Sequence, residues 1–179
     1  MRVIPCSLVV PLAVLASPLH AQSATIYSSP ELNSFSYGIL CYYDNDNPNV
    51  PLTRAQIDEI NATTAFFDDV RTDGSTKIPS AAGVTFGVLS NYPEGVTYDV
   101  TSTITHINRD GVAIEDTVPL VFDDVLEIDG WTFQSHGPEN LGTYRFQTFR
   151  DGEIIYDLSF EVVAPEEFAG DLPPCVTLP

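Results

Sequence analysis

The sequence has few basic residues, and this shortage excludes two classes of function. Seven Lys and Arg stand against 25 Asp and Glu, which gives a formal net charge of −18 at pH 7. A nucleic-acid-binding protein needs a basic face to neutralise phosphates, and binding to anionic lipid also needs positive charge. We therefore expect no nucleic-acid partner and no attraction to an anionic membrane.

The chain also lacks a long apolar segment. No stretch approaches the roughly 20 apolar residues of a membrane-spanning helix, so we expect no membrane span. A shorter apolar run, residues 3–15, follows Arg2 and leads into small residues that end at Ala21, a pattern typical of a secretory signal peptide. We predict that residues 1–21 are a signal, with cleavage after Ala16 as the alternative, and that the protein is exported, to the periplasm or fully secreted.

Cysteine is scarce, and the predicted signal contains one of the three, Cys6. Cys41 and Cys175 remain, and an even pair in an exported chain is typical of one disulfide. A bridge between them would close a long loop, which stabilises a domain by up to roughly 5 kcal/mol. We predict a structural Cys41–Cys175 disulfide, with two free thiols as the alternative.

Histidine is rare, which argues against nucleophilic catalysis. Beyond the predicted signal only His106 and His136 occur, and there is no G-x-S-x-G motif. Ser102 lies four residues before His106 on one predicted strand, about 13 Å away at ~3.3 Å per residue and out of hydrogen-bond reach. Neighbouring acids are common, but adjacent residues on a strand point to opposite faces and do not form a glycosidase pair. We expect His106 to be packed in its strand, His136 to be solvated, and the protein not to be an enzyme.

Short alternating segments separated by turn residues dominate the rest of the chain. The clearest pair flanks Asp151-Gly152, which fits a two-residue type I′ turn and places Arg150 opposite Glu153. Farther upstream, two short strands are predicted at residues 112–114 and 118–122. About seven to nine short antiparallel strands with frequent turns predict an all-β, immunoglobulin-like β-sandwich.

Other local signals complete the predicted domain organisation. Thr53 and Gln56 have capping-box spacing, which predicts one short helix near 53–60. Tyr144, just after a glycine-containing corner, resembles the tyrosine corner of immunoglobulin-like sandwiches. We predict a flexible lead-in at 22–33, the sandwich at 34–163, and an extended Pro-rich tail at 164–179 that Cys175 holds in place.

Several motifs resemble a bacterial exported family known as a domain of unknown function. The run IPSAAGVTFGV at 78–88 resembles the family signature V-P-A-x-x-G-x-x-F-G, and GTYRF at 142–146 resembles G-T-W-x-F. ITH at 104–106 and the closing strand at 152–163 also fit, so the resemblance covers roughly residues 34–163. Tyr144 replaces the usual Trp, and no Pro-Pro follows His106. The resemblance implies an exported immunoglobulin-like sandwich and no known activity.

Two kinds of binding residue are candidates. Asp44 and Asp46, in an Asp/Asn-rich loop, offer hard oxygen ligands for calcium, but the loop does not fit the EF-hand pattern and a solvated turn is the alternative. Trp131, Tyr92 and Phe149 are the aromatic side chains that a sugar-binding surface would need.

We predict an exported, non-enzymatic binding or structural module whose partner is an unknown envelope protein or polymer. The alternative function is a calcium-stabilised ligand-binding module, for example one for sugars. No cofactor is expected, with calcium as the single candidate.

Overall fold

The computed structural model of the chain describes residues 26–44, 47–53, 55–57, 69–95, 97–122, 126–135 and 137–176. Eleven strands lie within these residues. In chain order they are β1 (Tyr27–Ser28), β2 (Ser34–Asp44), β3 (Asn47–Pro51), β4 (Asp69–Thr72), β5 (Lys77–Pro79), β6 (Thr85–Asn91), β7 (Tyr98–Asn108), β8 (Ala113–Phe122), β9 (Leu126–Thr132), β10 (Gly142–Arg150) and β11 (Glu153–Val163).

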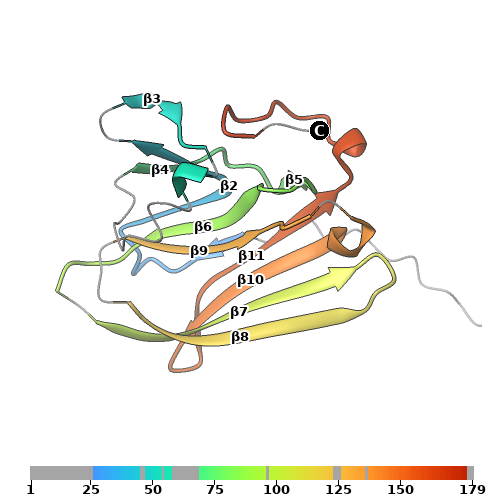
Figure 1. Ribbon diagram of the computed structural model, residues 1–179. Helices are drawn as coiled ribbons and strands as arrows, with labels where there is room; N and C mark the ends of the chain where they lie inside the picture. Colours follow the sequence, from blue (N-terminus) through green and yellow to red (C-terminus); the bar gives the residue numbers. More distant parts are fainter. Residues whose placement is uncertain are drawn as a thin grey trace, which may run out of the picture.

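These strands form two sheets that face each other (Figure 1). Sheet I has the order β1-β11-β10-β7-β8, with β5 also paired to β11, and sheet II has the order β3-β2-β6-β9, with β4 also paired to β2. The described strand pairs are antiparallel except β5 with β11, which is parallel. The all-β sandwich predicted from the sequence is confirmed. It has more strands than the expected seven to nine or so, and one of the additional strands, β1, has only two residues and carries too little alternation to be recognised.

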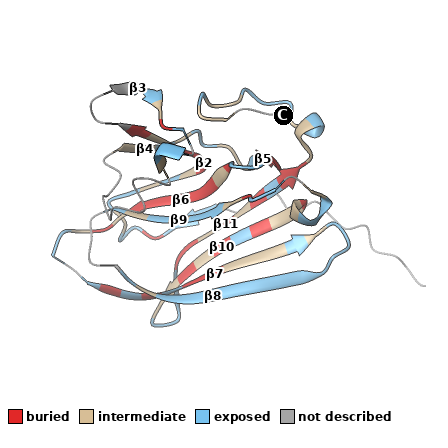
Figure 2. Ribbon diagram, viewed as in Figure 1, coloured by how far each residue is buried: buried red, intermediate tan, exposed pale blue. Residues whose placement is uncertain are grey.

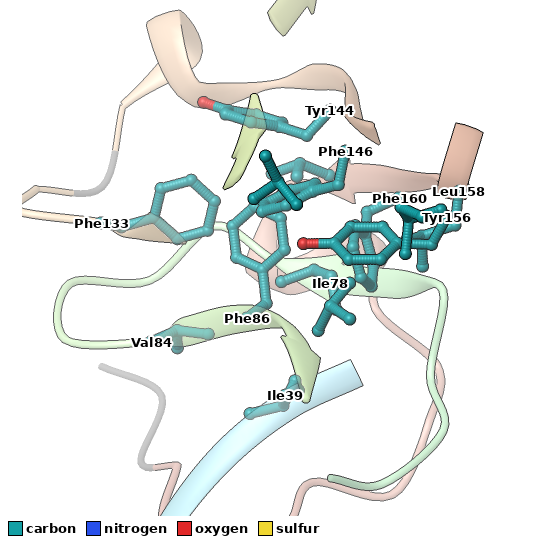
Figure 3. Packing of buried hydrophobic residues seen from close by; sticks show 14 of the residues in the cluster. Ile39, Ile78, Val84, Phe86, Phe133, Tyr144, Phe146, Tyr156, Leu158 and Phe160 are labelled. Carbon is teal, nitrogen blue, oxygen red and sulfur yellow. The ribbon is translucent and has the colours of Figure 1, made fainter. Parts of the chain in front are cut away.

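Aromatic side chains fill the space between the two sheets. Alternate residues of β10 point inward, so that Tyr144 and Phe146 are buried while Arg145 between them is exposed. Figure 3 shows the ring of Phe86 at the centre of this core, with its centroid 5.2 Å from Phe133, 5.3 Å from Tyr144, 5.8 Å from Phe146 and 5.1 Å from Phe160. Most of these rings meet edge to face, the arrangement that aromatic quadrupoles favour.

The hairpin between β10 and β11 has the turn predicted from the sequence. Asp151 and Gly152 both have positive φ, 51° and 82°, as a type I′ turn requires. Arg150 and Glu153 lie opposite each other in the register. The guanidinium of Arg150 nevertheless forms its ion pair with Glu31, at 2.5 Å, and lies over the Tyr98 ring.

Both ends of the described chain are attached to the sandwich. Within the segment predicted to be a flexible lead-in, β1 pairs with β11, and the backbone N–H of Ser29 donates to the carbonyl of Ile155 at 2.7 Å. This correction rests on backbone hydrogen bonds, which leave no side-chain pattern in so short a strand. Near the other end, Cys175 forms the expected disulfide with Cys41 across a sequence separation of 134 residues. The predicted signal lies outside the described residues.

The predicted short helix begins where its capping signal stands. Residues 55–57 are helical, and the N–H of Ile57 donates to the carbonyl of Thr53 at 3.0 Å. The backbone N–H of Thr53 donates to the Gln56 side chain at 2.9 Å, which is half of a capping box. The remainder of the predicted helix lies outside the described residues.

Candidate functional site

Strand β8 forms one edge of sheet I and is exposed along nearly its whole length (Figure 2). Three of its apolar side chains are exposed to large fractions: Ile114 to 64%, Val118 to 43% and Val121 to 61%. Ile114 and Val118 lie on one face of the strand with Asp116 between them, and Val121 lies on the other face. Exposed apolar side chains on a ten-residue edge strand are typical of an interaction surface or of a site prone to strand pairing.

The exposure of β8 arises because sheet I extends beyond sheet II. The carboxylate of Asp129, on the edge strand β9 of sheet II, accepts hydrogen bonds from Ser102 of β7 and Tyr156 of β11. Strand β9 therefore lies over the middle of sheet I, and β8 lies one strand farther out. The inward-facing side chains of β8 share a face with the core but are not covered by sheet II. We call this surface the open edge; it comprises Ile114, Asp116, Val118 and Leu120 of β8 and Trp131 of β9.

The Asp129 cluster links the two sheets beside the open edge. The Tyr156 hydroxyl donates to Asp129 at 2.8 Å, and the Ser102 hydroxyl donates to the same carboxylate oxygen. Burial raises the pKa of Asp129 because it penalises the charged form, and the two hydroxyl donors offset part of this effect. Burial likewise raises the pKa of Tyr156 well above its ordinary value. The cluster is a polar contact between sheets within a largely apolar interior.

Three rings lie at the end of the open edge. His106 stacks on Tyr144 with a centroid distance of 4.1 Å, and the ring of Trp131 lies 5.9 Å from that of Tyr144. Tyr144 is buried, and burial raises the pKa of its hydroxyl to about 12. His106 is thus packed in its strand, as expected. Trp131 is 37% exposed, and His106, which stacks on the same Tyr144 ring, is the register partner of Ile114 on β8.

The partners of Ser102 and His106 match the prediction that these two side chains are out of hydrogen-bond reach of each other. Ser102 bonds to Asp129, whereas Nε2 of His106 lies 3.3 Å from the carbonyl oxygen of Leu141. The Ser–His contact that nucleophilic catalysis needs is therefore not formed by this pair. His136 lies outside the described residues.

The three aromatic residues considered for sugar binding do not share one surface. Tyr92 is only 1% exposed and packs against Tyr98 at a centroid distance of 4.8 Å, so it belongs to the core and is not available to a sugar. Phe149 is partly buried. Tyr92 precedes a proline in a turn-like segment, where a surface position is common. Its burial depends on the strands that pack over it in the folded chain.

The calcium hypothesis stays a prediction. Asp46 and the side chain of Asp44 lie outside the described residues. Elsewhere, in the part of the chain that the structure describes, no three His, Cys, Asp or Glu side chains gather where they would hold a metal ion.

None of the helices in the described ranges has the length and apolar character that a membrane crossing demands.

The sequence did not single out the open edge. It predicted two short strands, at 112–114 and 118–122, because Glu115, Asp116 and Pro119 interrupt the apolar pattern. The structure joins them into one ten-residue strand. Pro and acidic residues inside an apolar strand are themselves typical of an edge, and this was the signal available in the sequence.

The fold and the exposed edge define a two-sheet β-sandwich of unassigned activity. Residues 28–162 match the family model described as Domain of unknown function (DUF3859), and the chain belongs to this family. The family resemblance predicted from the sequence is confirmed. No curated protein matches the chain. The chain is similar to the crystal structure of an immunoglobulin-like protein from Pseudomonas aeruginosa, with 14% identity, a TM-score of 0.47, and coverage of 80% of this chain and 100% of that one.

Proposed function

We propose that the protein is an exported, non-enzymatic module that binds a partner protein through the open edge. The observation that carries the proposal is the exposure of Ile114, Val118 and Trp131 along an uncovered sheet edge. Exposed apolar side chains that lie together lose contact with water when a partner covers them, which favours binding by about 25 cal/mol per Å² of apolar area.

Two further features support the proposal. The Cys41–Cys175 disulfide fits an oxidising compartment outside the cytoplasm, where such bonds persist. Beside the open edge, the hydroxyls of Ser102 and Tyr156 are bonded within the fold, since both donate to Asp129. A binding role through the apolar side chains does not call on these hydroxyls.

Site-specific photo-crosslinking in cells of the native host tests the proposal. A photoreactive amino acid is placed at Ile114 or Val118 in the full-length chain, and at Ile154 as the matched control. Ile154 is an exposed apolar residue, 39% accessible, on β11 next to the β10–β11 turn. We expect the same adduct from both open-edge positions and none from position 154. Equal yields at all three positions, or no adduct at 114 and 118, would contradict the proposal.

A further inference from the structure

The free side of β8 presents backbone hydrogen-bonding groups as well as apolar side chains. At the turn between β7 and β8, the N–H of Asn108 donates to the carbonyl of Val112 at 3.0 Å. The pair Ile107–Ala113 follows along the two strands, and the pair His106–Ile114 comes after it. Successive pairs in an antiparallel ladder alternate between hydrogen-bonded and non-hydrogen-bonded. The even-numbered residues of β8 therefore bond to β7, and the odd-numbered ones direct their N–H and C=O groups to the free side.

Pro119 agrees with this assignment. It pairs with Thr101 at an odd-numbered position, where its missing N–H takes no hydrogen bond from β7. The same proline removes one donor from the free side. Residues 113–117 form the proline-free part of this edge, with outward backbone groups at Ala113, Glu115 and Thr117. An edge of this kind binds an extended chain as an additional strand.

The inward-facing side chains of β8 form an apolar–acidic–apolar row. Ile114, Asp116 and Val118 stand at successive positions on one face. A strand added to β8 would place its own side chains about 4.5–5.5 Å from these. Apolar side chains beside Ile114 and Val118 and a cation beside Asp116 would complement the row.

Among the described ion pairs none includes Asp116, so a cation on a bound partner has a carboxylate available there. Four described arginines are already ion-paired, namely Arg71 with Asp69, Arg109 with Glu167, Arg145 with Asp157 and Arg150 with Glu31. In the register row of Asp116 the neighbouring residues are Ile104 and Phe146, which carry no charge. A second copy of the chain carries the same net charge of −18 and the same Glu115 and Asp116 on its edge, so charge repulsion disfavours it as the occupant.

From this placement, and resting on the proposed function, we propose that β8 binds an extended segment of its partner protein as an additional strand. The segment has the pattern apolar–x–Lys/Arg–x–apolar, with the basic residue beside Asp116. Main-chain hydrogen bonds from residues 113–117 hold the added strand. The side chains of Ile114, Asp116 and Val118 determine which sequence it can have.

Hydrogen exchange and peptide binding test this mode together. The probes are acetyl-TVTKTVT-amide and its matched control acetyl-TVTETVT-amide, and both orientations of these symmetric peptides present the same pattern. We expect the Lys peptide to bind the ¹⁵N-labelled protein at least about tenfold more tightly than the Glu peptide, and more weakly as salt rises. On binding, the amides of Ala113, Glu115 and Thr117 should gain protection at least about tenfold, while those of Ile114 and Asp116 change little.

Two backbone variants should change peptide affinity in opposite directions. Thr117→Pro removes an outward N–H without touching the β7 ladder, so it should abolish binding of the Lys peptide. Thr117→Val is its control, because it also loses the hydroxyl contact with Thr103, at 3.1 Å, but keeps the N–H. Pro119→Ala restores an outward N–H and should tighten binding. If Thr117→Pro does not fold, Asp116→Lys provides the test, since it should reverse the preference toward the Glu peptide.

The outcomes separate this inference from the proposed function. Absence of Lys-peptide binding, or binding without protection of the odd-numbered amides, overturns strand addition while crosslinks from Ile114 and Val118 still support a binding surface there. Loss of those crosslinks rejects the proposed function whatever the peptides do. Protection of the same amides that grows with protein concentration, without peptide, would show that a second copy occupies the edge and would also overturn the inference.

Discussion

Strands β10 and β8 belong to the same sheet and both have side chains that face the same side, but only one of them is covered. On β10, Tyr144 and Phe146 point into the core and are almost completely buried. On β8, Ile114 and Val118 point to the same face and remain largely exposed. Alternation in the sequence therefore determines which face of the sheet a side chain occupies. Whether that face is buried depends on whether the opposite sheet covers it.

The boundary between the two regions lies at Asp129. Its carboxylate on β9 reaches Ser102 and Tyr156, so sheet II ends over the middle of sheet I. Covered strands contribute stability through packing, and the uncovered strand contributes a surface. Substitutions in the covered strands should therefore change the free energy of unfolding, and substitutions on β8 should change partner binding with little effect on stability.

The largest effect is expected in the covered region. Phe86→Ala removes a fully buried ring that contacts four other aromatic rings, which we expect to lower the free energy of unfolding by about 3–5 kcal/mol. Urea unfolding followed by tryptophan fluorescence measures the change. Phe86→Leu, which leaves a smaller cavity, should lose less; equal losses would mean that ring packing is not what Phe86 contributes.

Removal of the disulfide should have the next largest effect. The Cys41→Ala/Cys175→Ala variant releases a constraint across 134 residues, and we expect a loss of about 2–4 kcal/mol in the free energy of unfolding. Thermal or urea unfolding provides the measurement, and wild-type protein with a reducing agent should approach the variant. Unchanged stability in both samples would show that the bridge is not structural.

The Asp129 cluster at the boundary should make stability depend on pH. Because burial raises the folded-state pKa of Asp129 above its ordinary value of 3.8, the folded protein holds the proton more tightly than the unfolded chain. This contribution is fully present below pH 3.8 and is lost as the pH rises through the folded-state pKa. Asp129→Asn cannot ionise, so its stability relative to wild type should increase as the pH rises through this window.

Urea unfolding of both proteins across the pH range measures that difference. It should persist at high salt, where repulsion between surface charges is screened. A difference that is constant with pH would contradict the raised pKa of Asp129.

The smallest effect on stability is expected at the open edge. Ile114→Ala removes an apolar side chain that is already largely in water, so the free energy of unfolding should stay within about 0.5 kcal/mol of wild type. The same variant should lose crosslinking to the partner at Val118. A large loss of stability would instead make Ile114 part of the core and remove the contrast between β8 and β10.

Much of the fold was accessible from local patterns. The Asp151-Gly152 turn was predicted because few residues tolerate positive φ at both positions, and the structure shows the required angles. The buried face of β10 follows from its strict alternation. The capping contact between Thr53 and Gln56 also follows from their spacing.

Features that depend on contacts distant in sequence were missed or misplaced. The sequence left open whether Tyr92 is buried, and it packs against Tyr98 in the core because its position is set by which strands close over it. Strand β1 was taken as part of a lead-in because only its pairing with β11 makes it a strand. Arg150 lies opposite Glu153 as predicted, but its ion pair with Glu31, from another part of the chain, was not foreseen.

The sequence by itself determined that this is an acidic, all-β chain with one pair of cysteines beyond its N-terminal apolar run and a set of alternating strands, because composition, turn chemistry and period-two patterning are local properties. Only the tertiary structure decided that sheet I extends past sheet II and leaves β8 uncovered. That outcome depends on where the last strand of each sheet falls relative to the other, and Asp129 reaches Ser102 and Tyr156 across 27 residues in each direction. No local pattern encodes such a relation, because it arises only when the two sheets pack together.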